Sequence, residues 1–207
     1  MRMRFSQHEL IDLTKAWIAI SVAFTVVLMV RGGGATFLGT SSVVIVAIAT
    51  FILSAVTVGT GFLLHEAAHK YYAQKYGHFA EFVASDQMLL LALLMSPLGF
   101  IIALPGAVMI SGMITRKQYG IISIAGPITN FVIAVGFLIL FFTIPYPFVR
   151  DIATYGYFIN TWLGLFNLIP VWEFDGKKIL AWSKQYYFIT LAVGLFLFFI
   201  VGRFLPF

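Results

Sequence analysis

Cysteine is absent from this 207-residue sequence, which excludes a disulfide framework, a thiolate nucleophile and any cysteine-ligated metal site. Charge is scarce as well, since 10% of the residues are Asp, Glu, Lys or Arg and 61% are apolar. Despite the net charge of +5, no basic stretch is long enough to indicate nucleic-acid binding. A mean hydropathy of +0.98 and apolar runs of about eighteen residues or more are instead typical of a multi-pass membrane protein.

The apolar segments predict an all-α polytopic membrane protein that forms a single domain over residues 1–207. We expect about six membrane-embedded helices, at about residues 15–30, 41–76, 88–104, 119–144, 152–168 and 186–205. Pro105 and Gly106 end the third of these, and strand-forming residues follow between glycines. Because unpaired backbone is untenable in lipid, this segment is expected to be a short membrane-embedded β-hairpin or an extended re-entrant segment.

The distribution of basic residues predicts the orientation in the membrane. One allocation places ten of them on the same side, which is then expected to be cytoplasmic. These ten are Arg2, Arg4, Lys15, Lys70, Lys75, Arg116, Lys117, Lys177, Lys178 and Lys184. The allocation requires the chain between residues 75 and 116 to leave that side and return to it.

Two histidines and a glutamate interrupt the second apolar segment, in the sequence HEAAH. His65 and His69 are four residues apart, so on a helix they share one face and can bind one Zn²⁺, with Glu66 able to reach a metal-bound water. HExxH strings also occur by chance on the surface of soluble helices. Inside an apolar span, however, unused charge costs several kcal/mol, which favours a functional interpretation.

A catalytic zinc site needs a third protein ligand and an open position for water. Asp175 lies in a polar loop expected on the same side as the end of the HEAAH helix, and Gly176 allows close backbone approach there. An N-cap of the helix that starts near Lys177 explains Asp175 equally well, so spacing alone leaves both interpretations open. The other candidates for the third ligand are His78, Glu81, Asp86 and Glu173.

Three motifs in this order, HEAAH, AGPITN and NLIPVWEFDG, resemble the site-2 protease family of intramembrane zinc metallopeptidases. The resemblance covers roughly residues 51–179, with a catalytic core at about 41–185, and is strongest to short archaeal members without PDZ or CBS domains. It implies that His65, His69 and Asp175 bind one Zn²⁺ and that Glu66 is the general base. Asn167, in the Asn-x-x-Pro part of the third motif, would hold substrate or stabilise the oxyanion.

The resemblance also implies a transmembrane protein substrate, a location in the plasma membrane of a prokaryote, and an active site near its cytoplasmic side. The sequence PGAVMISG resembles the membrane-embedded hairpin of the family, to which an extended substrate strand could add, although a simple tight turn explains Pro105 and Gly106 equally well. The expected substrate-binding residues are Gly106, Ala107, Val108, Met109 and Ile110. The sequence departs from the family pattern at residues 172–174 and in the apolar segment 88–104.

Two other functions are compatible with polar residues inside membrane spans. A metal-binding transporter uses such residues as an ion route, but has no need of Glu66 beside the ligands, and the sequence lacks an internal repeat. An inactive scaffold of the same fold has no reason to keep every ligand. Away from the motif, Asn130 is interpreted as a structural amide that bonds a neighbouring helix, and Glu9, Asp12 and Lys15 as an amphipathic surface helix.

Overall fold

The computed structural model describes residues 3–34, 39, 42–101 and 105–205, and these residues are mainly helical. The α-helices are α1 (Gln7–Val30), α2 (Val43–Ser54), α3 (Thr60–Lys75), α4 (Asp86–Met95), α5 (Arg116–Thr143), α6 (Pro147–Asn167), α7 (Asp175–Trp182) and α8 (Lys184–Leu195). A π-helical turn, η2 (Ala55–Gly59), joins α2 to α3 without a break. Short turns extend other helices: η3 (Ser96–Leu98) follows α4, and η4 (Phe196–Ile200) and η5 (Val201–Phe204) follow α8.

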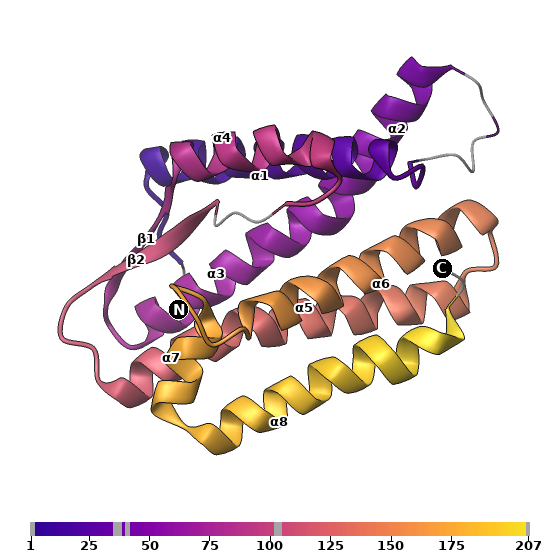
Figure 1. Ribbon diagram of the computed structural model, residues 1–207. Coiled ribbons are helices and arrows are strands. Elements are labelled where there is room, and N and C mark those ends of the chain that lie inside the picture. Colours follow the sequence, from indigo (N-terminus) through magenta and orange to yellow (C-terminus); the bar gives the residue numbers. More distant parts are fainter. Residues whose placement is uncertain (1–2, 35–38, 40–41, 102–104, 206–207) are drawn as a thin grey trace.

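The helices form two groups that α3 connects. Helices α1 and α4 lie side by side on one side of the molecule, and α5, α6 and α8 lie on the other, with α3 crossing between them (Figure 1). Helix α3 contacts α1, α5 and α6, so its side chains meet both groups. The HEAAH motif therefore lies on the helix that connects the two groups.

Among the described residues, four helices are long and apolar enough to cross a membrane: Gln7–Val30, Val43–Lys75, Arg116–Thr143 and Lys184–Phe204. The prediction of about six membrane-embedded helices is thus met in part. Helix α6 has sufficient length, but its polar residues, including Arg150 and Asp151, make it less apolar than these four. Of the segment expected as a helix at 88–104, the structure describes residues 88–101, where the helical residues belong to α4 and η3; together these are too short for a full span at ~1.5 Å per residue. Residues 102–104 of that prediction lie outside the described part of the chain.

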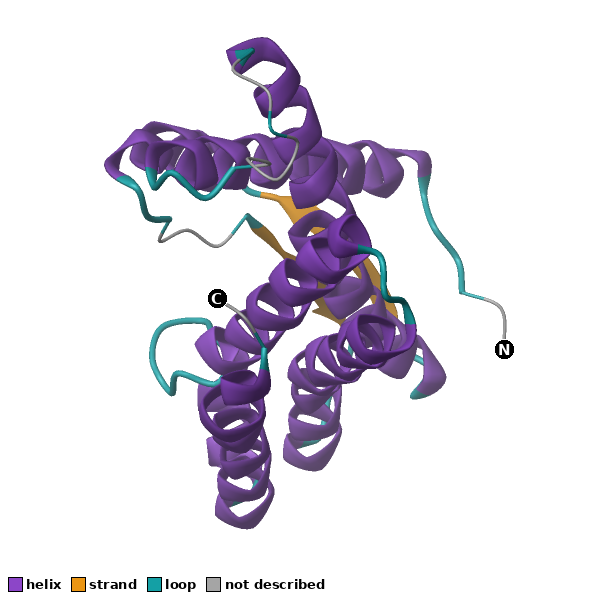
Figure 2. Ribbon diagram, turned by 90° about the vertical axis from the view of Figure 1, so that its right-hand side faces the viewer, coloured by secondary structure: helices purple, strands orange, loops and turns teal. Residues whose placement is uncertain are grey.

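A small antiparallel sheet lies at one end of the molecule, between the α1–α4 group and the other helices (Figure 2). Its strands are β1 (Phe79–Ala84) and β2 (Gly106–Ser111), and Phe82 is paired with Val108. The strand at 106–111 agrees with the sequence pattern. The expected short hairpin within the PGAVMISG segment is not observed, because β2 pairs with β1, which lies before α4 in the sequence.

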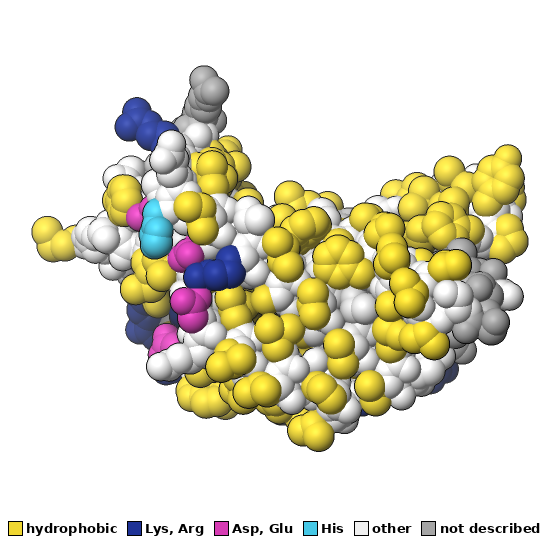
Figure 3. Space-filling view, turned by 90° about the horizontal axis from the view of Figure 1, so that it is seen from above, with side chains coloured by type: hydrophobic (Ala, Val, Ile, Leu, Met, Phe, Trp, Pro, Cys, Tyr) yellow, Lys and Arg dark blue, Asp and Glu magenta, His cyan; other side chains and the backbone are white. Residues whose placement is uncertain are grey.

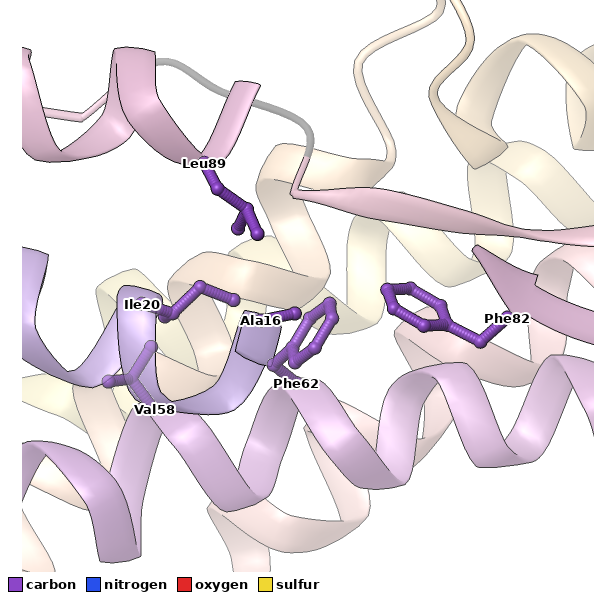
Figure 4. Close-up of a cluster of buried hydrophobic side chains, with 6 residues drawn as sticks. All are labelled: Ala16, Ile20, Val58, Phe62, Phe82 and Leu89. Atoms are coloured by element: carbon purple, nitrogen blue, oxygen red, sulfur yellow. The ribbon is translucent and has the colours of Figure 1, made fainter. Parts of the chain in front are cut away.

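A cluster of buried apolar side chains fixes α1, α4 and the sheet on α3 (Figure 4). Its members come from α1, η2, α3, β1 and α4, and are Ala16, Ile20, Val58, Phe62, Phe82 and Leu89. The rings of Phe62 and Phe82 meet edge to face, with centroids 5.7 Å apart. The cluster thus holds the sheet by close packing one turn before the HEAAH motif.

Charged side chains are unevenly distributed over the surface. On the face formed by α1 and α4, most of them gather at the end where the sheet and α7 lie, and apolar side chains cover the rest (Figure 3). The end of α3 and the beginnings of α5, α7 and α8 lie at that same end (Figure 1). The chain thus leaves this end of the molecule after α3 and is back at it where α5 begins.

Candidate metal centre

The two histidines of HEAAH point their ring nitrogens at each other. His65 and His69 are both buried on α3, and their Nε2 atoms are 3.0 Å apart. Their imidazole planes are nearly perpendicular, at 85°. The spacing of four residues thus gives the shared face that the sequence predicts.

The opposite ring nitrogens have partners that can only accept hydrogen bonds from them. His69 Nδ1 lies 2.8 Å from the carbonyl oxygen of Ile122, and His65 Nδ1 lies 2.6 Å from Asn130 Oδ1. The orientation of the Asn130 amide is set by its Nδ2, which donates to the carbonyl oxygen of Gly61. Both Nδ1 atoms therefore carry the proton, and in neutral imidazoles both Nε2 atoms present a lone pair to the same point.

Asp175 brings a third donor atom to this point. Its Oδ2 lies 3.3 Å from His65 Nε2 and 3.0 Å from His69 Nε2, and the side chain is buried. Asp175 is the first residue of α7, and the N-cap position is occupied by Phe174, which makes no side-chain cap. The N-cap interpretation is thus not met, and Asp175 lies where it could serve as the third ligand of a metal ion.

The path of the chain around Asp175 depends on close packing. A Cβ atom on Gly176 would lie 2.1 Å from the carbonyl oxygen of Leu168, so only glycine fits where α7 meets the end of α6. Phe174 is buried and packs edge to face on Phe166, with centroids 4.8 Å apart. Residues 172–174, which depart from the family pattern, therefore still bring Asp175 to the histidines.

Charge and geometry both suit a metal ion. Lys178 Nζ lies 3.7 Å from Oδ1, which leaves Oδ2 to face the imidazoles. Tetrahedral zinc with bonds of about 2.0–2.2 Å separates its ligand atoms by roughly 3.3–3.6 Å, slightly more than the observed 3.0–3.3 Å.

Within the described residues, His65, His69 and Asp175 are the group of His, Asp or Glu side chains placed to hold a metal ion. The other candidates for the third ligand lie elsewhere. Glu81 bonds Ser6, Asp86 pairs with Lys15, and Glu173 pairs with Lys177. His78 is not part of the group either.

A cavity of about 100 Å³ opens beside these three side chains and is large enough to hold water. Glu66 and His65 line it from α3, and Asn167 lines it from the end of α6. The Asn167 amide donates one hydrogen bond to the carbonyl oxygen of Leu163, 3.0 Å away. We observe no hydrogen bond between Asn167 and His65, His69 or Asp175. Of the expected substrate-binding residues Gly106, Ala107, Val108, Met109 and Ile110, Gly106 lines this cavity.

The sequence interpretation missed part of the surroundings of His65. Asn130 bonds a neighbouring helix as expected, through Asn160 Oδ1 at 3.2 Å, but its own Oδ1 also fixes His65. Asn160 in turn donates to the carbonyl oxygens of Gly156 and Thr57, and both asparagines are fully buried. The signal was present in AGPITN, since a buried amide inside an apolar helix requires partners.

Curated relatives match most of the chain. It is 36% identical over 195 residues to a protein of Methanocaldococcus jannaschii named "Putative zinc metalloprotease MJ0611", an alignment that covers 93% of this chain and 92% of the relative. It is 35% identical over 143 residues to "Zinc metalloprotease MJ0392" of the same archaeon, covering 66% of this chain and 35% of the relative. Family models and solved structures give no match. The relative that the chain matches nearly end to end is named a zinc metalloprotease, and His65, His69 and Asp175 are placed to hold a metal ion. The chain therefore belongs to the site-2 protease family of zinc metalloproteases.

Proposed function

We propose that the chain is an intramembrane zinc endopeptidase, which hydrolyses peptide bonds within or near transmembrane segments of other proteins. The observation that carries this proposal is the convergence of three lone-pair donors, from His65, His69 and Asp175, on one buried point. Without a cation between them, two neutral imidazoles and a carboxylate would repel one another at 3.0–3.3 Å. The names of the relatives support zinc as that cation.

When bound, the zinc ion supplies Lewis-acid activation of water and of the scissile carbonyl. Glu66 lines the cavity next to His65, where its carboxylate can accept a proton from the attacking water and later donate it to the leaving amine. Asn167 lines the same cavity and uses one of its two amide N–H groups on Leu163, so the other can donate to the substrate carbonyl. A single donor of this kind contributes about 3 kcal/mol in other enzymes.

The substrate must present an extended segment, because the peptide bonds of a helix are shielded by its own hydrogen bonds. Strand β2 supplies a surface for such a segment. In the antiparallel register, Val108 and Ile110 face β1 in pairs without hydrogen bonds, so their N–H and C=O groups point to the outer edge of β2. We propose that the substrate strand adds to this edge and leads into the cavity that Gly106 lines.

The test combines metal analysis with cleavage of a single-span model substrate in detergent. We expect Glu66→Gln to keep zinc and lose turnover, and His65→Ala and Asp175→Ala to lose both. A metal transporter would tolerate Glu66→Gln with only a modest loss of transport, and an inactive scaffold would cleave nothing in any form. Cleavage by Glu66→Gln at the wild-type rate would overturn the proposal.

A further inference from the structure

The outer edge of β1 is occupied by side chains instead of a third strand. Glu9 Oε1 accepts a hydrogen bond from the N–H of Phe82 at 3.0 Å, and Asp12 Oδ2 accepts one from the N–H of Ala84 at 2.9 Å. Lys70 Nζ donates to the carbonyl oxygen of Ala80 at 3.0 Å. Residues 80, 82 and 84 are the alternate positions whose backbone points away from β2.

These three side chains, which we name the edge clamp, are almost completely inaccessible. Glu9, Lys70 and Asp12 are 0%, 2% and 4% exposed. Glu9 Oε2 also forms an ion pair with Lys70 Nζ, so Glu9 bridges the lysine and the backbone of Phe82. The sequence interpretation placed Glu9 and Asp12 on an amphipathic surface helix, whereas both side chains are buried against β1 at the start of α1.

The edge clamp connects the sheet to the metal centre by a short route. Lys70 is the residue after His69 on α3, and its side chain bonds the backbone of β1 while the His69 imidazole meets Asp175. Glu9 and Asp12 come from α1, which thereby holds β1 at two further points. A shift of the sheet along α3 would have to break charge-assisted hydrogen bonds in a buried setting, where a lone charge is strongly unfavourable.

The two edges of the sheet therefore differ. The edge of β1 is closed by the edge clamp, whereas the edge of β2 carries the outward backbone groups of Val108 and Ile110. We propose that the edge clamp is a positioning device: Glu9, Asp12 and Lys70 hold the sheet in one register relative to the metal ligands, and so determine which substrate bond is cleaved. This inference rests on the proposed function, in which the substrate strand adds to β2.

The test uses the double variant Glu9→Leu/Lys70→Met, which removes both charges so that neither remains buried alone. We expect it to melt closer to wild type than either single variant, and to keep its zinc. Because a misplacement of about 1 Å can reduce the rate by ~100-fold, we expect kcat/KM to fall by roughly 10- to 100-fold. Mass spectrometry of the products should show cleavage spread over neighbouring bonds, which loss of folded enzyme alone would not cause.

A second measurement does not depend on activity. Because the chain has no cysteine, spin labels can be placed at Met109→Cys on β2 and Tyr71→Cys on α3, both of which are exposed. We expect one narrow distance distribution in the wild-type background and a broadened or displaced one in the double variant. Lys75→Met is the matched control, since Lys75 is an exposed lysine on the same helix that contacts Tyr72 and not the sheet.

The outcomes separate the two proposals. If wild type cleaves its substrate and Glu66→Gln does not, the proposed function stands, and unchanged cleavage sites with an unchanged label distance in the double variant would refute the edge clamp. If the double variant fails to fold, Asp12→Ala takes its place, because it removes one acceptor from β1 and leaves Lys15 paired with Asp86. Asp12→Ala with wild-type cleavage sites and label distances would refute the clamp equally.

Discussion

Replacement of Asn130 by leucine tests how the protein orients its metal ligands. Asn130 Oδ1 is the acceptor that holds the proton of His65 on Nδ1, at 2.6 Å, and thereby keeps the lone pair of Nε2 directed at Asp175. Loss of such a partner typically weakens metal binding by about 10- to 100-fold, which is about 1.4 to 2.8 kcal/mol. We therefore expect Asn130→Leu to bind zinc 10- to 100-fold more weakly while His65, His69 and Asp175 are all present.

The same substitution also reduces stability, so the two effects have to be separated. It leaves His65 Nδ1 and Asn160 Oδ1 without a partner, at a cost of roughly 1–3 kcal/mol for each group that stays buried. Asn160→Leu is the matched control, since it breaks the same amide pair but keeps the bond between Asn130 and His65. We expect this control to lose comparable stability and to bind zinc within about threefold of wild type.

The assay is a competition titration against a chromogenic zinc chelator in detergent at fixed pH, together with thermal unfolding of each variant. Equal losses of zinc affinity in Asn130→Leu and Asn160→Leu would mean that loosening of the helix packing is responsible. Wild-type affinity in Asn130→Leu would refute the reasoning, because the orientation of His65 would then not depend on its Nδ1 partner.

Three further substitutions test other contacts of the site. Gly126→Ala places a Cβ atom 2.5 Å from Nε2 of both imidazoles, so we expect at least about a tenfold loss of zinc affinity, measured by the same titration. Gly176→Ala forces a Cβ to within 2.1 Å of the carbonyl oxygen of Leu168, so we expect a lower melting temperature and loss of zinc as Asp175 is displaced; retained zinc would contradict this. Val108→Pro removes an N–H group from the outer edge of β2 and breaks no hydrogen bond between β1 and β2. We expect this variant to keep its fold and its zinc and to lose cleavage, whereas retained cleavage would exclude strand addition.

The sequence predicts most of the metal centre, because its chemistry is local. The spacing of His65 and His69 fixes their shared face whatever the rest of the fold, and an apolar span makes an idle Glu66 costly. The placement of Asp175 is different. Its distance from the histidines depends on how α6, α7 and α3 pack, and spacing alone did not separate a ligand from a helix cap.

The contacts of the other polar residues could not be predicted, because they depend on strand pairing across long separations. Glu9 and Asp12 have the pattern of an amphipathic helix, and only the position of β1 turns them into buried acceptors. The apolar segment after β1 has the composition of a span. Its helix is nevertheless too short to cross a membrane, because a 3₁₀ turn that starts at Ser96 and Pro97 ends it and Gly99 follows with a positive φ of 83°.

The central claim is that side chains from α3 and α7 hold one zinc ion together, and anomalous diffraction at the zinc edge tests it most directly. Crystals of the purified protein should show a single strong peak within about 2.0–2.2 Å of His65 Nε2, His69 Nε2 and Asp175 Oδ2. A peak bound elsewhere, or one that contacts the histidines but not Asp175, would contradict the account.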